Sequence, residues 1–396
     1  MKKAKRVSVL ISAVVLIFAI AVSMAGCSAP SAPTSVPTSA PPTADSSTTA
    51  PPETAALPES QKPEAAPITL DIGLLGTSIK PVGVIVAEAM GYFEEEGVIV
   101  NFQKVSSMND AYLAVSTGAL DVYLFSSTAA ATFISQGTTT LRVFGGTAGE
   151  GSEIMAAAGK DYVIEMAEDF VGLRIACSMP ETGQMVLKDY LIRQGYTIGA
   201  PGEEADVTFV YINDSGTAIE GCIKGEYDLC ITNSSLGYYA GEYGVEVVAT
   251  VRDFVETYPC CRQTCNQETY EKEFDALVKF EIATLRGHEF YLNDMEETLD
   301  ILEEYSGEDR EFLRAQIYGT DDYSPVMRLS LDPDKAACVA FYEALSNLGE
   351  IENSVSVDWD EYVVTDVYKT ALDTLAEREP DSAVWGELTD YFNTHN

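Results

Sequence analysis

The chain has few histidines and few basic residues, and both shortages exclude functions. Only His288 and His395 occur among 396 residues, so no Ser-His-Asp triad can be placed and a histidine-based metal site lacks ligands. Lysine and arginine number 24 against 62 acidic residues, which gives a net charge of −38 at pH 7. Such a surface repels phosphate backbones, and no basic stripe interrupts it. The sequence therefore excludes nucleic acid as a partner, and we expect no catalytic residues, no metal and no cofactor.

The amino terminus has the layout of an export signal. Basic residues precede an apolar run over residues 7–22, which is short for a bilayer-spanning helix, and small residues then lead to Cys27. Residues 1–26 are therefore predicted to be a secretory signal peptide, with an uncleaved anchor helix as the alternative. The basic residues are Lys2, Lys3, Lys5 and Arg6, and the chain is still more acidic without them.

Ser, Pro, Thr and Ala make up almost all of the next segment. Such a composition buries too little apolar surface to offset the entropy lost on ordering, so residues 27–66 are predicted to be a disordered tether. A flexible chain of about 40 residues spans on the order of 35 Å. The tether would keep a globular domain within that distance of its attachment point.

A short pattern occurs once in each half of the globular part. Residues 118–127 read GALDVYLFSS and residues 225–235 read GEYDLCITNSS, with Asp three positions after Gly in both. An amphipathic stretch precedes each copy. Each copy therefore predicts a helix, a Gly cap, a short buried strand and a Ser-rich turn. Two similar halves, each with a polar turn at a strand end, favour a ligand held between them.

Alternating strands and helices predict an α/β fold with two lobes, each a sheet flanked by helices. Residues 67–151 and 252–396 are assigned to the first lobe and residues 152–251 to the second. A single helix is expected over residues 82–96. The glycine-rich residues 145–151 are predicted to form a flexible crossing between the lobes.

Polar residues that follow predicted strands are the candidate ligand-binding groups. Hydroxyl oxygens and free N–H groups meet at the carboxyl ends of strands, where open α/β folds bind ligands. Asp214 also follows a strand, but a helix cap is its favoured role. The candidates are Thr77, Ser78, Ser106, Ser107, Ser126, Ser127, Thr147, Ser178, Thr182, Gly183, Asn233 and Ser234.

One arginine and several aromatic residues extend this list. Arg262 is a candidate for gripping an anion with two hydrogen bonds, and a structural ion pair with a carboxylate is the equal alternative. Tyr211, Tyr238, Tyr239 and Phe125 either stack on a planar ligand or pack in the core.

Three segments resemble the extracytoplasmic solute-binding proteins of ABC importers, in the branch that serves nitrate, sulfonate, taurine and thiamine-pyrimidine uptake. They are residues 91–103 (GYFEEEGVIVNFQ), the STGALDV unit, and residues 237–249 (GYYAGEYGVEVVA). The resemblance implies a two-lobed periplasmic-binding-protein-like fold of type II. It also implies that the lobes close on a small solute and deliver it to a membrane permease.

Residues 24–27 resemble the lipobox of bacterial lipoproteins, although Met24 stands where that family prefers Leu. The resemblance implies that Cys27 carries the lipid attachment and becomes the first residue of the mature protein. The globular part would then be anchored at the extracytoplasmic face of the cell membrane.

Cys260, Cys261 and Cys265 form a cluster that loosely resembles a cysteine-rich patch of the related pyrimidine-synthase family, where the patch serves iron chemistry. A disulfide, inert thiols and a metal site all remain open for this cluster. Four other cysteines stand in apolar runs and are predicted to be buried. They are Cys177, Cys222, Cys230 and Cys338.

We therefore predict a monomeric, membrane-tethered solute-binding protein of an ABC importer and no enzyme. A thiamine-pyrimidine-synthase-like enzyme and a tethered ligand sensor are the alternatives. Arg262 and the helix starts favour a sulfonate-like or nitrate-like anion, whereas the tyrosines favour a pyrimidine-like ring. The identity of the solute stays open.

Overall fold

The structure, a computed structural model, describes residues 68–178, 181–233, 235–352 and 356–396. The described residues form one compact unit. The predicted signal peptide and the whole predicted tether, including Cys27, lie outside the described residues. Among the residues described, no helix combines the length and the apolar character needed to cross a bilayer.

The first sheet has six strands in the order β12-β4-β11-β3-β1-β2. β1 pairs in parallel with β2 and β3, whereas β11 lies between β3 and β4 and is antiparallel to both. The strand bounds are β1 Ile68–Leu75, β2 Val98–Val105, β3 Val122–Tyr123, β4 Leu141–Glu150, β11 Pro259–Asn266 and β12 Met327–Leu329.

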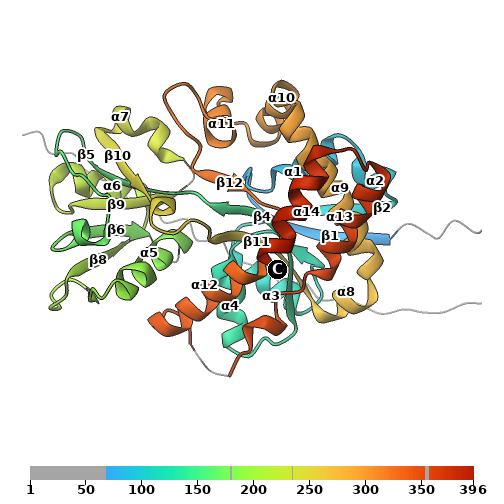
Figure 1. Ribbon diagram of the computed structural model, residues 1–396, viewed down its shortest axis with the longest axis horizontal. Coiled ribbons are helices and arrows are strands. Elements are labelled where there is room, and N and C mark those ends of the chain that lie inside the picture. Colours follow the sequence, from blue (N-terminus) through green and yellow to red (C-terminus); the bar gives the residue numbers. More distant parts are fainter. Residues whose placement is uncertain (1–67, 179–180, 234, 353–355) are drawn as a thin grey trace, which may run out of the picture. The chain divides into compact units, whose positions relative to one another are not determined.

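The second sheet also has six strands, in the order β10-β5-β9-β6-β8-β7. All of them come from residues 152–250, so the chain leaves the first sheet after β4 and returns to it through β11 (Figure 1). Their bounds are β5 Ser152–Ala157, β6 Arg174–Ser178, β7 Ile198–Gly199, β8 Val207–Ile212, β9 Leu229–Asn233 and β10 Val245–Thr250.

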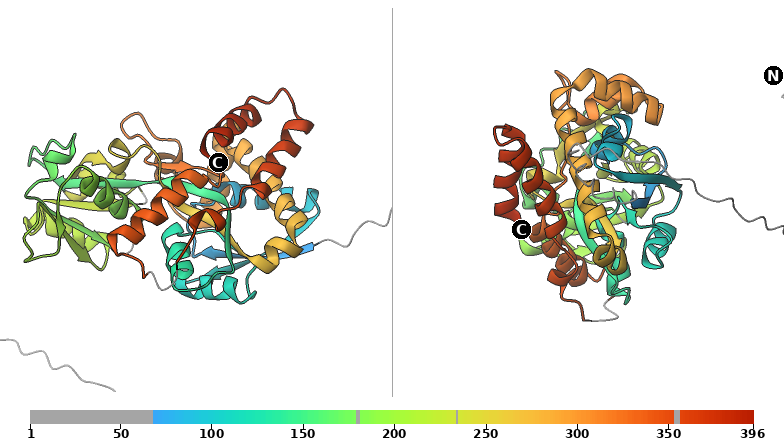
Figure 2. Two further views of the ribbon diagram at one scale, coloured as in Figure 1. Left: turned by 60° about the horizontal axis from the view of Figure 1, so that its bottom comes forward. Right: turned by 90° about the vertical axis from the view of Figure 1, so that its right-hand side faces the viewer.

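Helices flank both sheets, as predicted. In the first half these are α1 Val82–Ala89, α2 Tyr92–Glu95, α3 Met108–Ser116, α4 Ser127–Ser135, α5 Thr182–Arg193, α6 Ser215–Lys224 and α7 Ala240–Tyr243. The carboxy-terminal part is mainly helical, with α8 Gln267–Lys272, α9 Phe274–Asn293, α10 Met295–Ser306, α11 Arg310–Ile317, α12 Lys335–Leu348, α13 Asp366–Arg378 and α14 Ala383–His395. Helix α9 packs against β1 and β2, α13 packs against α9, and α14 packs against α13 (Figure 2).

The repeated pattern has the same geometry in both sheets. Gly118 and Gly225 end their helices with φ of 74° and 75°, a left-handed conformation that glycine adopts without strain. Asp121 then accepts a hydrogen bond from the backbone N–H of Asp71 at 2.8 Å, and Asp228 accepts one from Arg174 N–H at 2.9 Å. The repeated aspartate thus ties each short strand to its parallel neighbour.

Two predicted elements differ from the structure. The helix expected over residues 82–96 is divided into α1 and α2, because Gly91 has a φ of 74° and interrupts the helical backbone. The segment predicted as a flexible crossing over 145–151 does lead to the second sheet, but residues 145–150 are the buried end of β4, and only Gly151 separates β4 from β5. Its glycines permit close packing, since a Cβ on Gly145 would lie 2.2 Å from Glu281 Oε1 and one on Gly146 would lie 2.3 Å from Ser330 O.

Helices α1 and α9 cross at two glycines. A Cβ on Gly287 would lie 2.1 Å from the carbonyl oxygen of Gly83, and a Cβ on Gly83 would lie 2.9 Å from Thr284 O. The two helix backbones therefore approach more closely than they could if either glycine carried a side chain. This contact holds the start of α1, and with it the loop of residues 76–80 that links β1 to α1.

Gly287→Ala is expected to destabilise the protein by about 1–3 kcal/mol, because the added methyl group has no space at the helix crossing. Gly386 is the matched control, since it also lies in a helix but no atom lies within 4 Å of the position of its Cβ. Gly386→Ala should stabilise by about 0.5–1 kcal/mol through helix propensity. Urea unfolding of the two variants measures both effects, and equal destabilisation would contradict the tight crossing.

His288 on α9 gives the stability a pH dependence of known sign. Burial lowers the pKa of its imidazole from 6.5 to about 4. As the pH falls, the unfolded chain therefore binds the proton before the folded protein does. The free energy of unfolding is unaffected by this group above pH 6.5 and decreases as the pH falls from 6.5 toward 4. The difference in unfolding free energy between the wild type and His288→Leu should shrink by about 3 kcal/mol over this range. A pH-independent difference would contradict the burial of a neutral ring.

Candidate functional site

Helix starts from the two sheets meet at one place. Ser126 caps α4, after β3 of the first sheet, and accepts from Ala129 N–H at 3.1 Å. Thr182 begins α5, after β6 of the second sheet. Thr128 Oγ1 and Thr182 Oγ1 lie 3.4 Å apart, so the first turns of the two helices touch. The N–H groups and dipoles of both helix starts are therefore directed at the same region.

A cavity of about 260 Å³ lies at this junction. Its wall combines hydroxyl, amide, carboxylate, ammonium, thiol and apolar groups from both sheets. The lining residues are Leu75, Ser78, Lys80, Met108, Phe125, Ser126, Glu181, Thr182, Asn233, Cys260 and Cys261.

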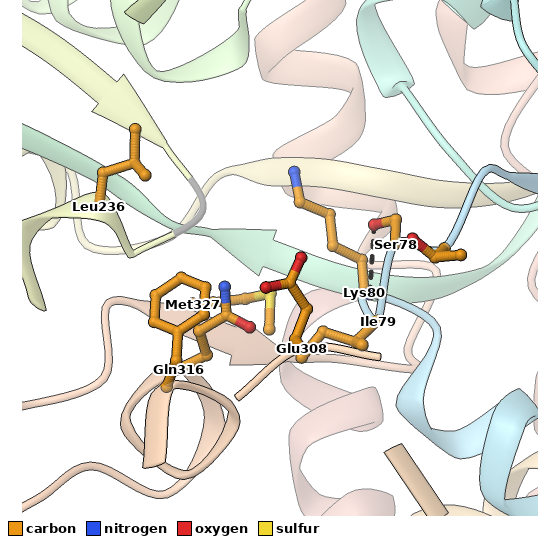
Figure 3. A pocket seen from close by; sticks show the side chains of 9 residues that line it. Ser78, Ile79, Lys80, Leu236, Glu308, Gln316 and Met327 are labelled. Atoms are coloured by element: carbon orange, nitrogen blue, oxygen red, sulfur yellow. Dashed lines mark hydrogen bonds between the residues drawn. The ribbon is translucent and has the colours of Figure 1, made fainter. Parts of the chain in front are cut away.

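A second cavity, of about 330 Å³, adjoins the first and shares Ser78 and Lys80 with it. In Figure 3, Ser78, Ile79 and Lys80 reach it from the loop after β1, and Leu236 comes from the segment after β9. Carboxy-terminal residues close the remaining side. These are Glu308, Phe312, Gln316 and Met327.

Lys80 and Cys260 form a charged pair in the first cavity. Lys80 Nζ lies 3.6 Å from Cys260 Sγ, and Cys261 Sγ also lies 3.6 Å from Cys260 Sγ. The hydrogen bond from Cys261 and the charge of Lys80 outweigh burial and lower the pKa of the Cys260 thiol to about 5. The negative charge on Cys260 in turn raises the pKa of Lys80. The hydrogen bond to Cys260, together with burial, raises the pKa of Cys261 well above its usual value.

Glu181 brings a carboxyl group to the same cavity. Its Oε1 accepts a hydrogen bond from Ser178 Oγ at 2.9 Å. Its Oε2 is buried, and a hydrogen bond from the Asn233 side chain is one of the effects that lower the pKa of this carboxyl group. Burial is the largest effect and raises the pKa of Glu181, while Ser178 and Lys80 oppose that rise. The cavity therefore holds a carboxyl group whose oxygens can accept further hydrogen bonds.

Five of the predicted site residues line the two cavities. Ser78, Ser126, Thr182 and Asn233 line the first, and Thr77 and Ser78 line the second. Ser234 lies outside the described residues.

The other predicted hydroxyl residues and Gly183 have local or packing roles. Ser106 is exposed, and Ser107 caps α3 through Asp110 N–H. Ser127 bonds Tyr342 Oη at 2.9 Å, and Thr147 donates to Leu124 O at 3.1 Å. Ser178 bonds the cavity residue Glu181, and Gly183 leaves room for Ser152, whose Oγ would lie 2.0 Å from an added Cβ.

Arg262 does not line either cavity. Its side chain is 1% exposed and donates to the carbonyl oxygens of Pro333 at 3.2 Å, Ala148 at 3.3 Å and Cys261 at 3.0 Å. Arg262 Nη2 lies 3.9 Å from Asp334 Oδ2. This geometry favours the structural ion pair over the grip on an anion.

Most of the aromatic candidates also pack against protein. Tyr238 and Tyr239 contact Phe312, with ring centroids 6.0 and 4.9 Å apart. Tyr211 Oη donates to Glu350 Oε1 at 3.0 Å, whereas Phe125 lines the first cavity. Asp214 caps α6 by accepting from Thr217 N–H at 2.9 Å, as favoured from the sequence.

Sequence reasoning missed Lys80 and Glu181. Lys80 follows the predicted loop residues Thr77 and Ser78, and Glu181 directly precedes Thr182. Both are charged residues beside residues already chosen, which is the signal that was available. The cysteine cluster divides, because Cys260 and Cys261 line the cavity whereas Cys265 does not. The described cysteines are all free thiols, and no described group of three or more His, Cys, Asp or Glu side chains is arranged to hold a metal.

Two further contacts join elements of the second sheet to carboxy-terminal segments. Lys188 Nζ on α5 lies 2.6 Å from Glu350 Oε1, just after α12. Tyr323 Oη donates to Glu153 Oε1 on β5 at 2.6 Å. Burial raises the pKa of Glu153, and the hydrogen bond from Tyr323 opposes that rise. Carboxy-terminal residues thus contact strand β5 of the second sheet and helix α5 beside it.

Solved structures with this fold include several binding proteins. The nitrate-binding protein NrtA of Synechocystis is 14% identical with a TM-score of 0.60, and the match covers 79% of this chain and 91% of NrtA. The aliphatic sulphonate-binding protein SsuA of Escherichia coli is also 14% identical with a TM-score of 0.56, covering 76% of this chain and 92% of SsuA. The desulfurization enzyme DSZB matches as well, with 15% identity, a TM-score of 0.52, and coverage of 78% and 99%.

These likenesses confirm the two-lobed periplasmic-binding-protein-like fold. No curated protein matches the sequence significantly. The family model described as "NMT1/THI5 like" matches residues 79–298. Because that match spans more than half of the chain, the protein belongs to the NMT1/THI5-like family.

Proposed function

We propose that this chain is the solute-binding protein of an ABC importer, working as a monomer that captures a small solute between two lobes and hands it to a permease. The observation that carries the proposal is the cavity lined by the start of α4 from one side and the start of α5 from the other. The family and the binding-protein neighbours support it.

Lobe closure would supply the affinity. In this proposal residues 67–151 with 252–396 form one lobe and residues 152–251 the other, in agreement with the membership of the two sheets. Because each lobe contributes part of the cavity wall, a solute gains its full set of contacts only when the lobes meet. A ligand that binds one arrangement better shifts the population toward it. The contacts Lys188–Glu350 and Tyr323–Glu153 would then form and break with closure.

The chemistry of the cavity favours a nitrogen heterocycle over a simple anion. A carboxyl group at Glu181 repels a sulfonate or nitrate when it is ionised, and it accepts a hydrogen bond from an amino group. Lys80 donates to a ring nitrogen or oxygen, and Phe125 offers an apolar face. An aminopyrimidine matches this arrangement of donor, acceptor and apolar surface.

Attachment to the membrane completes the proposal. Cys27 would carry the lipid, and residues 27–66 would let the domain capture a solute and then carry it to the permease while it stays attached to the membrane. The lobes would then work at the extracytoplasmic face of the cell membrane.

Calorimetry of the domain without its lipid should detect micromolar binding of an aminopyrimidine and weaker or no binding of nitrate and alkanesulfonates. Glu181→Gln should weaken aminopyrimidine binding about tenfold to a hundredfold, because a charged acceptor is lost. Glu308→Gln is the matched control, since Glu308 lines only the adjoining cavity, and it should change the affinity little. Equally tight binding of alkanesulfonates would contradict the proposal that the solute is a heterocycle. Turnover of the bound compound would favour the synthase-like enzyme.

Cys27→Ala in the full chain should release the protein from the membrane fraction and abolish metabolic labelling with a fatty acid. Cys260→Ala is the matched control and should keep both. Fractionation and labelling measure the outcome, and membrane retention of Cys27→Ala without lipid would favour an uncleaved anchor helix instead.

A further inference from the structure

Two neighbouring cysteines of β11 face the same cavity, which a regular strand does not permit. Successive side chains of a strand point to opposite faces of the sheet. The pairing of β11 with β4 shifts register between Pro259 and Cys261 and again between Cys261 and Arg262. These irregularities re-aim the side chains, so that Cys260 and Cys261 both line the cavity with their sulfur atoms 3.6 Å apart.

The two thiols differ in access and in charge environment. Cys260 is partly exposed and lies 3.6 Å from Lys80 Nζ, whereas Cys261 is only 3% exposed. A cation beside an accessible thiol stabilises the thiolate, which is the nucleophilic form. Cys260 is therefore placed to react first and Cys261 to react second.

A second cysteine pair in the chain offers a direct comparison. Cys222 on α6 and Cys230 on β9 interact closely, and both pack in an apolar cluster at 1% and 0% exposure. They line neither of the two cavities described above. Closeness of two thiols is thus common to both pairs, but access and a neighbouring ammonium group belong only to Cys260 and Cys261.

We propose that Cys260 and Cys261 are a redox-active dithiol in the cavity, which reacts with a small disulfide compound and closes to a reversible disulfide between neighbouring residues. This reaction does not require the proposed function to be correct. Only its consequence, that oxidation alters solute capture by removing the anion paired with Lys80, rests on that function.

The exchange balances without any other reactant. The Cys260 thiolate attacks one sulfur of the small disulfide, its S–S bond breaks, and one thiolate leaves and takes up a proton. Cys261, after losing its proton to solvent, attacks Cys260 Sγ in the mixed disulfide and displaces the second thiol. The protein dithiol is oxidised and the small disulfide is reduced to two thiols.

The product should be easily reduced again. Neighbouring Cα atoms lie about 3.8 Å apart, below the roughly 4.4–6.8 Å at which disulfides are usually formed. Strained disulfides are the labile, regulatory ones. The pair is therefore suited to reversible oxidation rather than to structural stabilisation.

The test uses 2-hydroxyethyl disulfide and the folded domain, followed by mass spectrometry of the intact protein and its peptides. The wild type should lose two hydrogens in the peptide that contains Cys260 and Cys261, and dithiothreitol should restore them. Cys261→Ser should instead retain the mixed disulfide on Cys260. Cys260→Ser should react at least about tenfold more slowly, because the accessible thiolate is gone.

Lys80→Met should slow the first step about tenfold, and Lys80→Arg should largely restore it. Phenylarsine oxide, which bridges two close thiols, should bind the wild type and neither cysteine variant. The pair Cys222 and Cys230 should stay unmodified until the protein is unfolded. Unchanged reactivity of Cys260→Ser, or no reaction of the wild type at Cys260, would overturn the proposal, while solute binding measured on the reduced protein tests the proposed function separately.

Discussion

The position of β11 is the constraint on which the rest of the structure depends. The chain builds most of the first sheet, forms the entire second sheet, and then inserts β11 between β3 and β4. The start of this strand brings Cys260 and Cys261 to the cavity, and its next residue, Arg262, is held by three carbonyl oxygens and by Asp334. A buried guanidinium with these partners fixes β11 against β4 and against the segment that precedes α12.

The net charge of the protein differs from the arrangement of charged groups in its cavity. The net charge of −38 makes the protein strongly acidic, which disfavours contact with anionic macromolecules. Inside the cavity, one ammonium, one thiolate and one carboxyl group are set against two helix starts. In the proposed function, a small solute would therefore be selected by the placement of these few groups and not by the net charge.

The sequence predicted the architecture well because the strand and helix patterns are local. The repeat around Asp121 and Asp228 marked equivalent places in the two sheets, and the aspartates do equivalent work there. The cavity was only partly predictable. Ser126 and Thr182 were found because helix starts have a local signal, whereas Lys80 and Glu181 gain their meaning from partners brought close only by folding. Gly145 and Gly146 were predicted to be flexible, but they lie in a tightly packed strand. Flexibility and tight packing both favour glycine, so the sequence alone does not distinguish them.

The discontinuous first sheet also has a consequence for how the molecule assembles. The second sheet uses one unbroken stretch of chain, so its contacts close short loops and it can form early. The first sheet must wait for β11, which arrives only after that stretch is complete, and until then the edges of β3 and β4 stay open. A chain exported in the unfolded state would thus expose two unpaired strand edges until late in folding, and chaperone protection would matter most in that interval.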